Sequence, residues 1–197
     1  MDFSTFSVYL ELGGEHIADL NGYDHILFVT ALCAVYTWQN WRAVIGLVTA
    51  FTLGHSLTLA LTVLDVIPLR ADLIEFLIPV TILLTCIYTL LAAQTDAENR
   101  MELIRRYGLA AGFGLIHGMG FANFLRSLLG GEEDILLPLF AFNIGLELGQ
   151  LLIVAVVLTL SWLAVKVLKL PFLYWKNGVS ALVGIVAIRL IAQTWIF

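Results

Sequence analysis

Long apolar stretches separated by short polar ones run through almost the whole chain. Each stretch is close to the roughly 20 residues that an α-helix needs to cross the hydrocarbon core of a bilayer. The pattern predicts an all-α fold, a polytopic membrane helical bundle with six transmembrane helices in a single transmembrane domain, residues 1–197. The expected spans cover residues 16 or 23 to 38, 44–64, 73–92, 107–129, 135–165 and 174–196.

The N-terminal stretch differs from the spans, because its apolar residues alternate with a row of acids at helical spacing. Phe6, Leu10 and Ile17 would share one side of a helix, and acids spaced four apart would share another. This pattern predicts a short N-terminal interfacial helix over residues 3–15. Within the first span, Asn21-Gly22 predicts a break. A helix broken at membrane depth needs a site lined by protein or water to satisfy its backbone groups.

Composition agrees with a membrane protein and excludes a soluble module. The chain is 60% hydrophobic and 13% charged, with a mean hydropathy of +0.95, whereas soluble domains are about 25% charged. The net charge is −5 and the basic residues are scattered over loops, so no nucleic-acid partner is expected. Cys33 and Cys86 lie inside apolar runs and predict no disulfide framework. The pattern indicates no particular oligomeric state.

Lysines and arginines gather in the loops of one side. The first, third and fifth loops contain seven, and the opposite side contains two, Arg70 and Arg126. The positive-inside rule then places both termini outside the cytoplasm. Residues 132–134 and the segment from Glu15 to His25 would lie on the outer side, where their acids would concentrate cations. The seven basic residues are Arg42, Arg100, Arg105, Arg106, Lys166, Lys169 and Lys176.

Ionisable side chains occur near the middle of four spans. His55 and His117 each lie one residue from the centre of a span, and Glu147 lies about one turn from another centre. Asp24 and His25 reach the same depth if the first span begins early. A charge at this depth is costly without a partner and marks a functional site. We therefore predict that these five side chains line one cavity and bind a metal ion.

A second set of polar residues is expected to support this site or to add a ligand. Several candidates have a structural alternative when taken one at a time. His55 or His117 alone could be a satisfied buried histidine, and His16 a helix-end histidine that points at water. Ser56 could be a hydroxyl in helix packing, and the amides of Asn143 and Gln150 could bond across helices. Asn143 is expected to orient Glu147, and His16 to line an outer mouth with neighbouring acids. The set comprises His16, Asp19, Ser56, Asn143 and Gln150.

Two glycine pairs with small-xxx-small spacing are expected to let helices approach closely. They are Gly114/Gly118 in the fourth span and Gly145/Gly149 in the fifth. We predict that they bring these two spans together, so that short side chains from both can meet.

Three histidines with an aspartate and a glutamate suit a divalent cation of intermediate softness. Imidazole favours nickel, zinc, copper or iron, and a carboxylate adds charge. One interpretation is therefore a metal permease. A second is an intramembrane zinc-dependent hydrolase, in which Ser56 beside His55 takes part. A third is a metal-sensing membrane protein without flux. Proton relays use the same residue types, so a proton-coupled step is compatible with this set.

Five short motifs in order resemble the HupE/UreJ family of bacterial membrane proteins, in its shorter branch. The resemblance covers roughly residues 9 to 152, and its specificity comes from the order of the motifs. They are Gly13-x-x-His16-Ile17, Gly22-x-Asp24-His25-Ile26-Leu27-Phe28, Phe51-Thr52-x-Gly54-His55-Ser56-x-Thr58-Leu59, His117-Gly118-x-Gly120-Phe121-Ala122 and Phe142-Asn143-x-Gly145-x-Glu147-x-Gly149-Gln150.

The resemblance implies secondary transport of nickel or a related metal that serves hydrogenase or urease maturation. Asp24-His25 also looks like part of the His-Asp-His signature of nickel/cobalt permeases, although His16 and Asp24 are spaced more widely here. We expect a multi-pass permease of the bacterial inner membrane rather than an enzyme. Its substrate is expected to be nickel, with zinc, cobalt, iron or copper as alternatives, and its surroundings the lipid bilayer.

Overall fold

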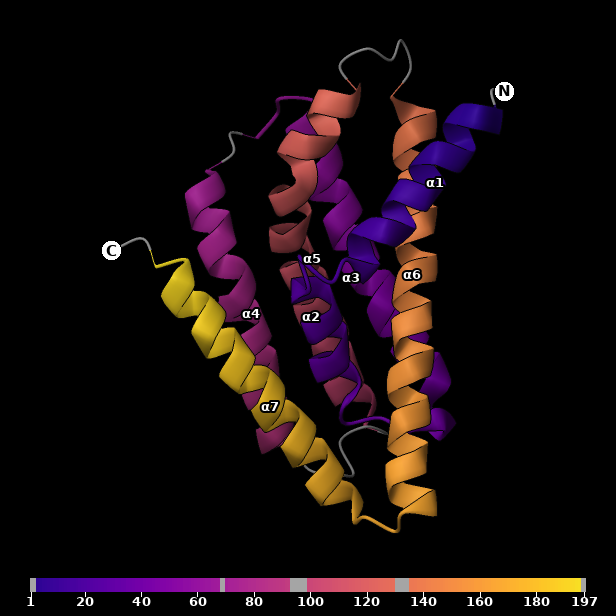
Figure 1. Ribbon diagram of the computed structural model, residues 1–197, viewed down its shortest axis with the longest axis vertical. Coiled ribbons are helices and arrows are strands. Elements are labelled where there is room, and N and C mark those ends of the chain that lie inside the picture. The colour runs from indigo at the N-terminus through magenta and orange to yellow at the C-terminus, as the bar shows by residue number, and fades with distance from the viewer. Residues whose placement is uncertain (1–2, 68–69, 93–98, 130–134, 196–197) are drawn as a thin grey trace.

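A computed structural model describes residues 3–67, 70–92, 99–129 and 135–195. Every regular element in these ranges is a helix (Figure 1). The long elements are α1 (Phe3–Ala18), α2 (Asp24–Cys33), α3 (Trp41–Val63), α4 (Ala71–Leu91), α5 (Arg100–Leu129), α6 (Leu136–Trp162) and α7 (Phe172–Gln193). A 3₁₀ turn, η1 (Trp38–Asn40), precedes α3, and a π-helical segment, η3 (Leu163–Val167), continues α6.

Five of the helices, α3 to α7, are long and apolar enough to cross a bilayer. Their bounds follow the expected second to sixth spans within a few residues, except at the start of α5. The all-helical, membrane-like bundle expected from the sequence is therefore confirmed to this extent. The acidic residues 132–134, expected on the outer side, lie outside the described residues.

The expected first span is not one continuous helix. α1 ends at Ala18, residues 19–23 are not helical, and α2 contains only 10 residues. At 1.5 Å per residue, α2 is about 15 Å long, half of the roughly 30 Å hydrocarbon core. The break expected at Asn21-Gly22 is present. The expectation that the span continues to Trp38 is wrong, because α2 ends at Cys33.

The N-terminal helix extends past its expected end at residue 15 and lies along α6. Gly13 faces Phe142, where an added Cβ would lie 2.0 Å from the carbonyl oxygen, and Gly145 faces Leu10 in the same way, at 1.9 Å. The two backbones therefore touch. Ile17 is fully buried against the same helix.

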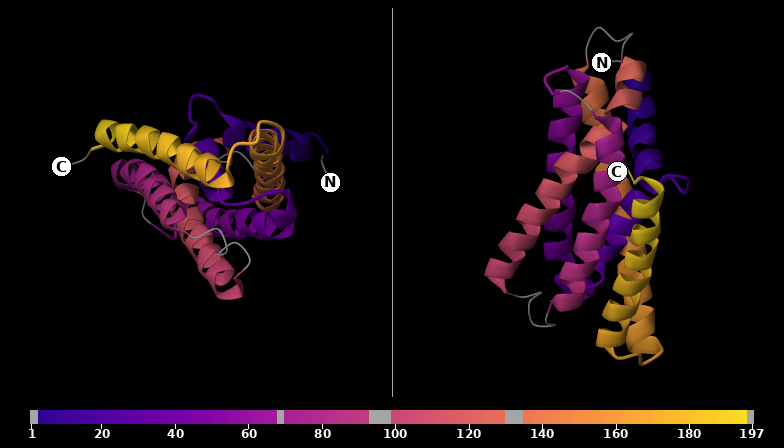
Figure 2. Two further views of the ribbon diagram at one scale, coloured as in Figure 1. Left: turned by 90° about the horizontal axis from the view of Figure 1, so that it is seen from below. Right: turned by 90° about the vertical axis from the view of Figure 1, so that its left-hand side faces the viewer.

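The glycine pairs bring together different helices from those expected. Gly114 and Gly118 of α5 face the backbone of α3, and Gly145 of α6 faces α1. The prediction that these glycines join α5 to α6 was wrong. Small residues show which face of a helix can be approached closely, but the partner depends on how the whole bundle is arranged. Figure 2 shows α4 and α7 as a third close pair.

The fourth span also begins earlier than expected. Arg100 to Arg106 were assigned to a loop, but they form the first two turns of α5. Glu102 lies 3.2 Å from Arg106 across one helical turn and 3.8 Å from Arg105. Ion pairs at this spacing stabilise a helix, and Arg106 is buried as a result of its position against the neighbouring helices.

Glycines of α5 offer a matched test of the close contact between α3 and α5. An added Cβ at Gly114 would lie 2.2 Å from the Phe51 carbonyl oxygen, whereas Gly112 has no neighbour within 4 Å. We expect Gly114→Ala to destabilise the fold by about 1–3 kcal/mol through overpacking. Gly112→Ala should be neutral or stabilising, because alanine is the better helix former. The free energy of unfolding, from titration with a denaturing detergent, measures both. Equal effects would contradict this packing.

Candidate metal centre

All four histidines of the chain meet in one cluster at the centre of the bundle. His25 lies in the middle of it. The centroid of its ring is 4.7 Å from that of His16, 5.8 Å from that of His55 and 5.2 Å from that of His117. His55 and His117 are completely buried, and His25 is 3% exposed. The tertiary structure thus brings together histidines that lie up to about a hundred residues apart in the sequence.

Two overlapping triads of this cluster have the geometry of metal sites. One comprises His16, His25 and His55, and the other comprises Asp24, His25 and His117. Within each triad the potential ligand atoms lie within 4.8 Å of one another. Metal–nitrogen and metal–oxygen bonds of about 2 Å require ligand atoms about 3–4 Å apart, so small side-chain rotations suffice to close either triad on an ion. His25 belongs to both.

Close helix contact and the interrupted span together create the cluster. An added Cβ at Gly118, the residue after His117, would lie 2.2 Å from the carbonyl oxygen of His55. The backbones of α3 and α5 therefore touch at the level of these histidines. The non-helical residues 19–23 turn the chain so that His16 at the end of α1 and His25 at the start of α2 face each other.

Most ring nitrogens of the cluster are buried without a hydrogen-bond partner among the described residues. They are Nε2 of His16, Nε2 of His25, both nitrogens of His55 and Nδ1 of His117. Burying a polar atom without a partner costs free energy, and native proteins pair nearly all such atoms. Five of them in one place indicate a ligand that accepts nitrogen lone pairs, which is what a transition-metal ion does.

Two of the remaining nitrogens have defined partners. His25 Nδ1 lies 3.2 Å from Asp24 Oδ1, so the carboxylate accepts this N–H and leaves Nε2 as the ligand atom. His117 Nε2 lies 2.9 Å from Thr81 Oγ1. The Thr81 hydroxyl donates to the carbonyl of Ile78 at 2.7 Å, so its oxygen accepts from His117 Nε2–H. His117 therefore presents Nδ1.

Sequence reasoning missed Thr81. It lies on α4, which carries none of the predicted ligands. The available signal was a row of threonines four residues apart, Thr81, Thr85 and Thr89, in the more apolar part of this helix. All three are buried.

Phenylalanines surround the histidines. Phe28 and Phe51 each place their ring centroid 5.2 Å from that of His117, and Phe121 lies 3.8 Å from His16. Apolar walls lower the local dielectric, which strengthens the attraction between the Asp24 carboxylate and a cation. The histidine cluster is thus a polar centre enclosed by aromatic rings.

Glu147 lies in neither triad. It accepts a hydrogen bond from Thr49 at 2.6 Å, across the contact between α3 and α6. Gln150 accepts from Thr52 at 2.8 Å. These hydrogen-bonded pairs form a row of polar residues between α3 and α6, beside the histidine cluster, which we call the polar seam.

Ser56 and Asn143, which were also predicted to support the site, belong to the same polar seam. The Ser56 hydroxyl lies 2.5 Å from Asn143 Oδ1 and 2.6 Å from the carbonyl of Thr52. The Asn143 amide nitrogen donates to the carbonyl of Leu139 at 2.7 Å. The hydrogen bonds of Asn143 are therefore to Ser56 and to its own helix, and Glu147 is held by Thr49.

Two open pockets reach the edge of the cluster. One, of about 700 Å³, is lined by Glu15, His16 and Asp19, the three residues expected to form a mouth. The other, of about 600 Å³, is lined by Asp24 and Glu75 together with both polar and apolar residues. Each pocket touches one triad through its outermost member, and each has carboxylates that attract cations.

Comparison with known proteins places the chain in a family. No curated protein and no solved structure matches it significantly. A protein-family model described as HupE / UreJ protein matches residues 2–197, nearly the whole chain, and the chain therefore belongs to the HupE/UreJ family.

Proposed function

We propose that this protein transports a divalent transition-metal cation, nickel in the first place, through the histidine cluster. The observation that carries the proposal is the meeting of four histidines and Asp24 at one buried point, with ring nitrogens lacking partners. A buried ionisable site in a membrane bundle is a feature of ion pathways. The HupE/UreJ family is associated with nickel and cobalt transport, which supports this choice.

The donor set supports a metal of the nickel, cobalt and zinc group. Imidazole nitrogens dominate, and the carboxylates of Asp24 and Glu147 add negative charge. The cysteines do not contribute, because Cys33 and Cys86 belong to the apolar core rather than to either triad. In our proposal the ion is held by Asp24, His25, His55 and His117. His16 replaces one of these residues as a ligand in turn, and Glu147 in the polar seam receives the ion as it passes through the protein.

A hydrolase finds less support. It needs a nucleophile or an activated water beside the metal, and Ser56 was the candidate. The Ser56 hydroxyl instead lies between Asn143 and the carbonyl of Thr52. A metal sensor would share the same cluster, and flux measurements separate it from a transporter.

We propose that the chain spans the inner membrane six times, with α1 and α2 together forming an interrupted first span. The ends of α2 and α4 and the start of α5 lie at one end of the bundle (Figure 1). This basic end holds the seven lysines and arginines that the sequence assigned to the first, third and fifth loops, and the positive-inside rule makes it cytoplasmic. Both pockets then open toward the outer half of the membrane.

Replacing His25 tests whether this residue serves as a ligand in both triads. His25→Ala breaks both triads, whereas His55→Ala or His117→Ala leaves one of them intact. We expect His25→Ala to lower nickel affinity by more than the roughly 10–100-fold typical of a lost supporting hydrogen bond, and the other two to lower it less. Equilibrium dialysis of purified protein measures affinity, and uptake into sealed vesicles measures flux.

The three variants must elute as the same folded species in size-exclusion chromatography. A His25→Ala protein that binds nickel as well as the wild type would refute the proposed site. Binding without uptake in the wild type would indicate a sensor.

Thr81 tests how His117 is oriented. Thr81→Val keeps the shape but removes the acceptor for His117 Nε2–H, so the ring loses the partner that makes Nδ1 the ligand. We expect a 10–100-fold loss of metal affinity, as for other residues that orient metal-binding histidines. Thr81→Ser should restore affinity. Thr85→Val is the matched control, because the Thr85 hydroxyl donates only to the carbonyl of Thr81. Equal behaviour of the two valine variants would contradict the assigned role.

Labelling of single cysteines tests the orientation. Gln39→Cys lies at the basic end, and Leu136→Cys, 74% exposed, lies at the opposite end. A membrane-impermeant maleimide added to intact cells should modify position 136 and reach position 39 only after permeabilisation. Cys33 and Cys86 stay in place because both are buried. Modification of both positions from the same side would disprove the orientation.

A further inference from the structure

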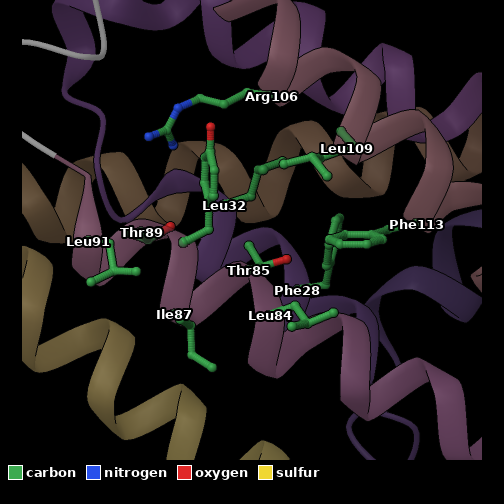
Figure 3. Close-up of a pocket in the computed structure, with 12 residues that line it drawn as sticks. Phe28, Leu32, Leu84, Thr85, Ile87, Thr89, Leu91, Arg106, Leu109 and Phe113 are labelled. Atoms are coloured by element: carbon green, nitrogen blue, oxygen red, sulfur yellow. The ribbon is translucent and has the colours of Figure 1, made fainter. Parts of the chain in front are cut away.

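An apolar pocket of about 360 Å³ lies between α4 and α5. Its lining includes none of the four histidines, although Phe28 at one end of it also contacts His117. Figure 3 shows leucines, Ile87 and two phenylalanines along it, with Arg106 at one end and Leu84 and Phe28 at the other. Figure 2 shows why the space exists: α5 begins apart from α4 and approaches the bundle only further along. The pocket therefore follows the divergence of two consecutive helices.

The side of this pocket faces outward. Leu84, Ile87 and Leu91 of α4 line it and are 48%, 44% and 82% exposed. In a membrane bundle such side chains meet lipid chains, so an occupant can come from the bilayer without crossing water. An apolar channel open toward hydrocarbon suits an acyl chain and offers little to a water-soluble ligand.

Arg106 gives the pocket a cationic end. Its side chain is 3% exposed and pairs with Glu102, which also pairs with Arg105. One carboxylate thus serves two guanidinium groups, and Tyr88 donates a further hydrogen bond to it at 2.5 Å. A net positive charge remains at this end of the pocket, which also lies at the basic end of the bundle.

Buried donors beside Arg106 lack acceptors. Arg106 Nη2 and the hydroxyl of Tyr36 have no hydrogen-bond partner among the described residues, although Tyr36 is completely buried. The guanidinium carbon lies 5.8 Å from the Tyr36 ring centroid, so both donors occupy one small region. Guanidinium groups donate and never accept, and the preferred partner of such donors is an anion with several oxygens, above all phosphate.

We propose that the α4–α5 pocket binds an anionic phospholipid, with its phosphate at Arg106 and an acyl chain along the apolar wall. Basic pockets between transmembrane helices on the cytoplasmic side suit anionic headgroups. A free phosphate would leave the apolar wall empty, and a helix of a second copy would leave the Arg106 donors without an anion. The residues that line this pocket include none of the proposed metal ligands.

Native mass spectrometry of the purified full-length protein tests the proposal, with phosphatidylglycerol and phosphatidylcholine of identical chains as probes. We expect the wild type to bind phosphatidylglycerol at least about 10-fold more tightly, because its headgroup has a net negative charge, whereas the trimethylammonium group of phosphatidylcholine offsets the charge of the phosphate. Arg106→Gln should abolish this preference. Leu109→Trp fills the pocket from α5 without touching the charge and should weaken binding of both lipids about 10-fold or more.

Matched controls are Arg126→Gln at the opposite end and Leu182→Trp, an exposed position of α7. Both should bind phosphatidylglycerol like the wild type. Thermal unfolding in phosphatidylcholine shows whether each variant is folded, and if Arg106→Gln is not, Leu109→Trp decides. Equal affinity for the two lipids, an equal rise in Tm with inorganic phosphate alone, or an unchanged Leu109→Trp would each overturn the proposal.

Discussion

Direct contact between helix backbones at glycine is the constraint on which the histidine cluster depends. Imidazole side chains are short, and helices with ordinary side chains between them lie about 8–10 Å apart. At Gly118 the backbone of α5 touches that of α3 beside His55, and at Gly145 the backbone of α6 touches α1. These two contacts place histidines from separate helices within reach of one ion. A larger residue at either contact would push the helices apart. The histidine nitrogens would then be separated although their chemical nature is unchanged.

The interrupted first span supplies the other half of the geometry. A continuous helix could not point His16 and His25 at each other across nine residues, whereas the break at residues 19–23 can. The break also places the start of α2 inside the protein with Asp24 in its first turn. The positive end of a helix dipole favours a carboxylate there. Asp24 therefore offsets the field of α2, which by itself would repel a cation.

α4 has two different faces that serve two different purposes. Toward the core, Thr81 accepts a hydrogen bond from His117 and thereby selects the nitrogen that is offered to an ion. Toward the outside, its leucines and Ile87 border the pocket that ends at Arg106. α4 thus carries no candidate ligand itself, but it orients His117 and shapes a surface that faces lipid. Changes in α4 can consequently affect the proposed metal site without altering its candidate ligands.

The sequence was sufficient to predict the helical character, the five long apolar helices and the break at Asn21-Gly22, because hydropathy and periodicity are local properties of the chain. It could not determine what each helix faces. Packing of the helices against one another set the partners of the glycine pairs, the pairing of Glu147 with Thr49, and the role of Thr81. Hydropathy gives position along the membrane normal, whereas rotation about each helix axis and the choice of lateral neighbour arise from packing between distant segments.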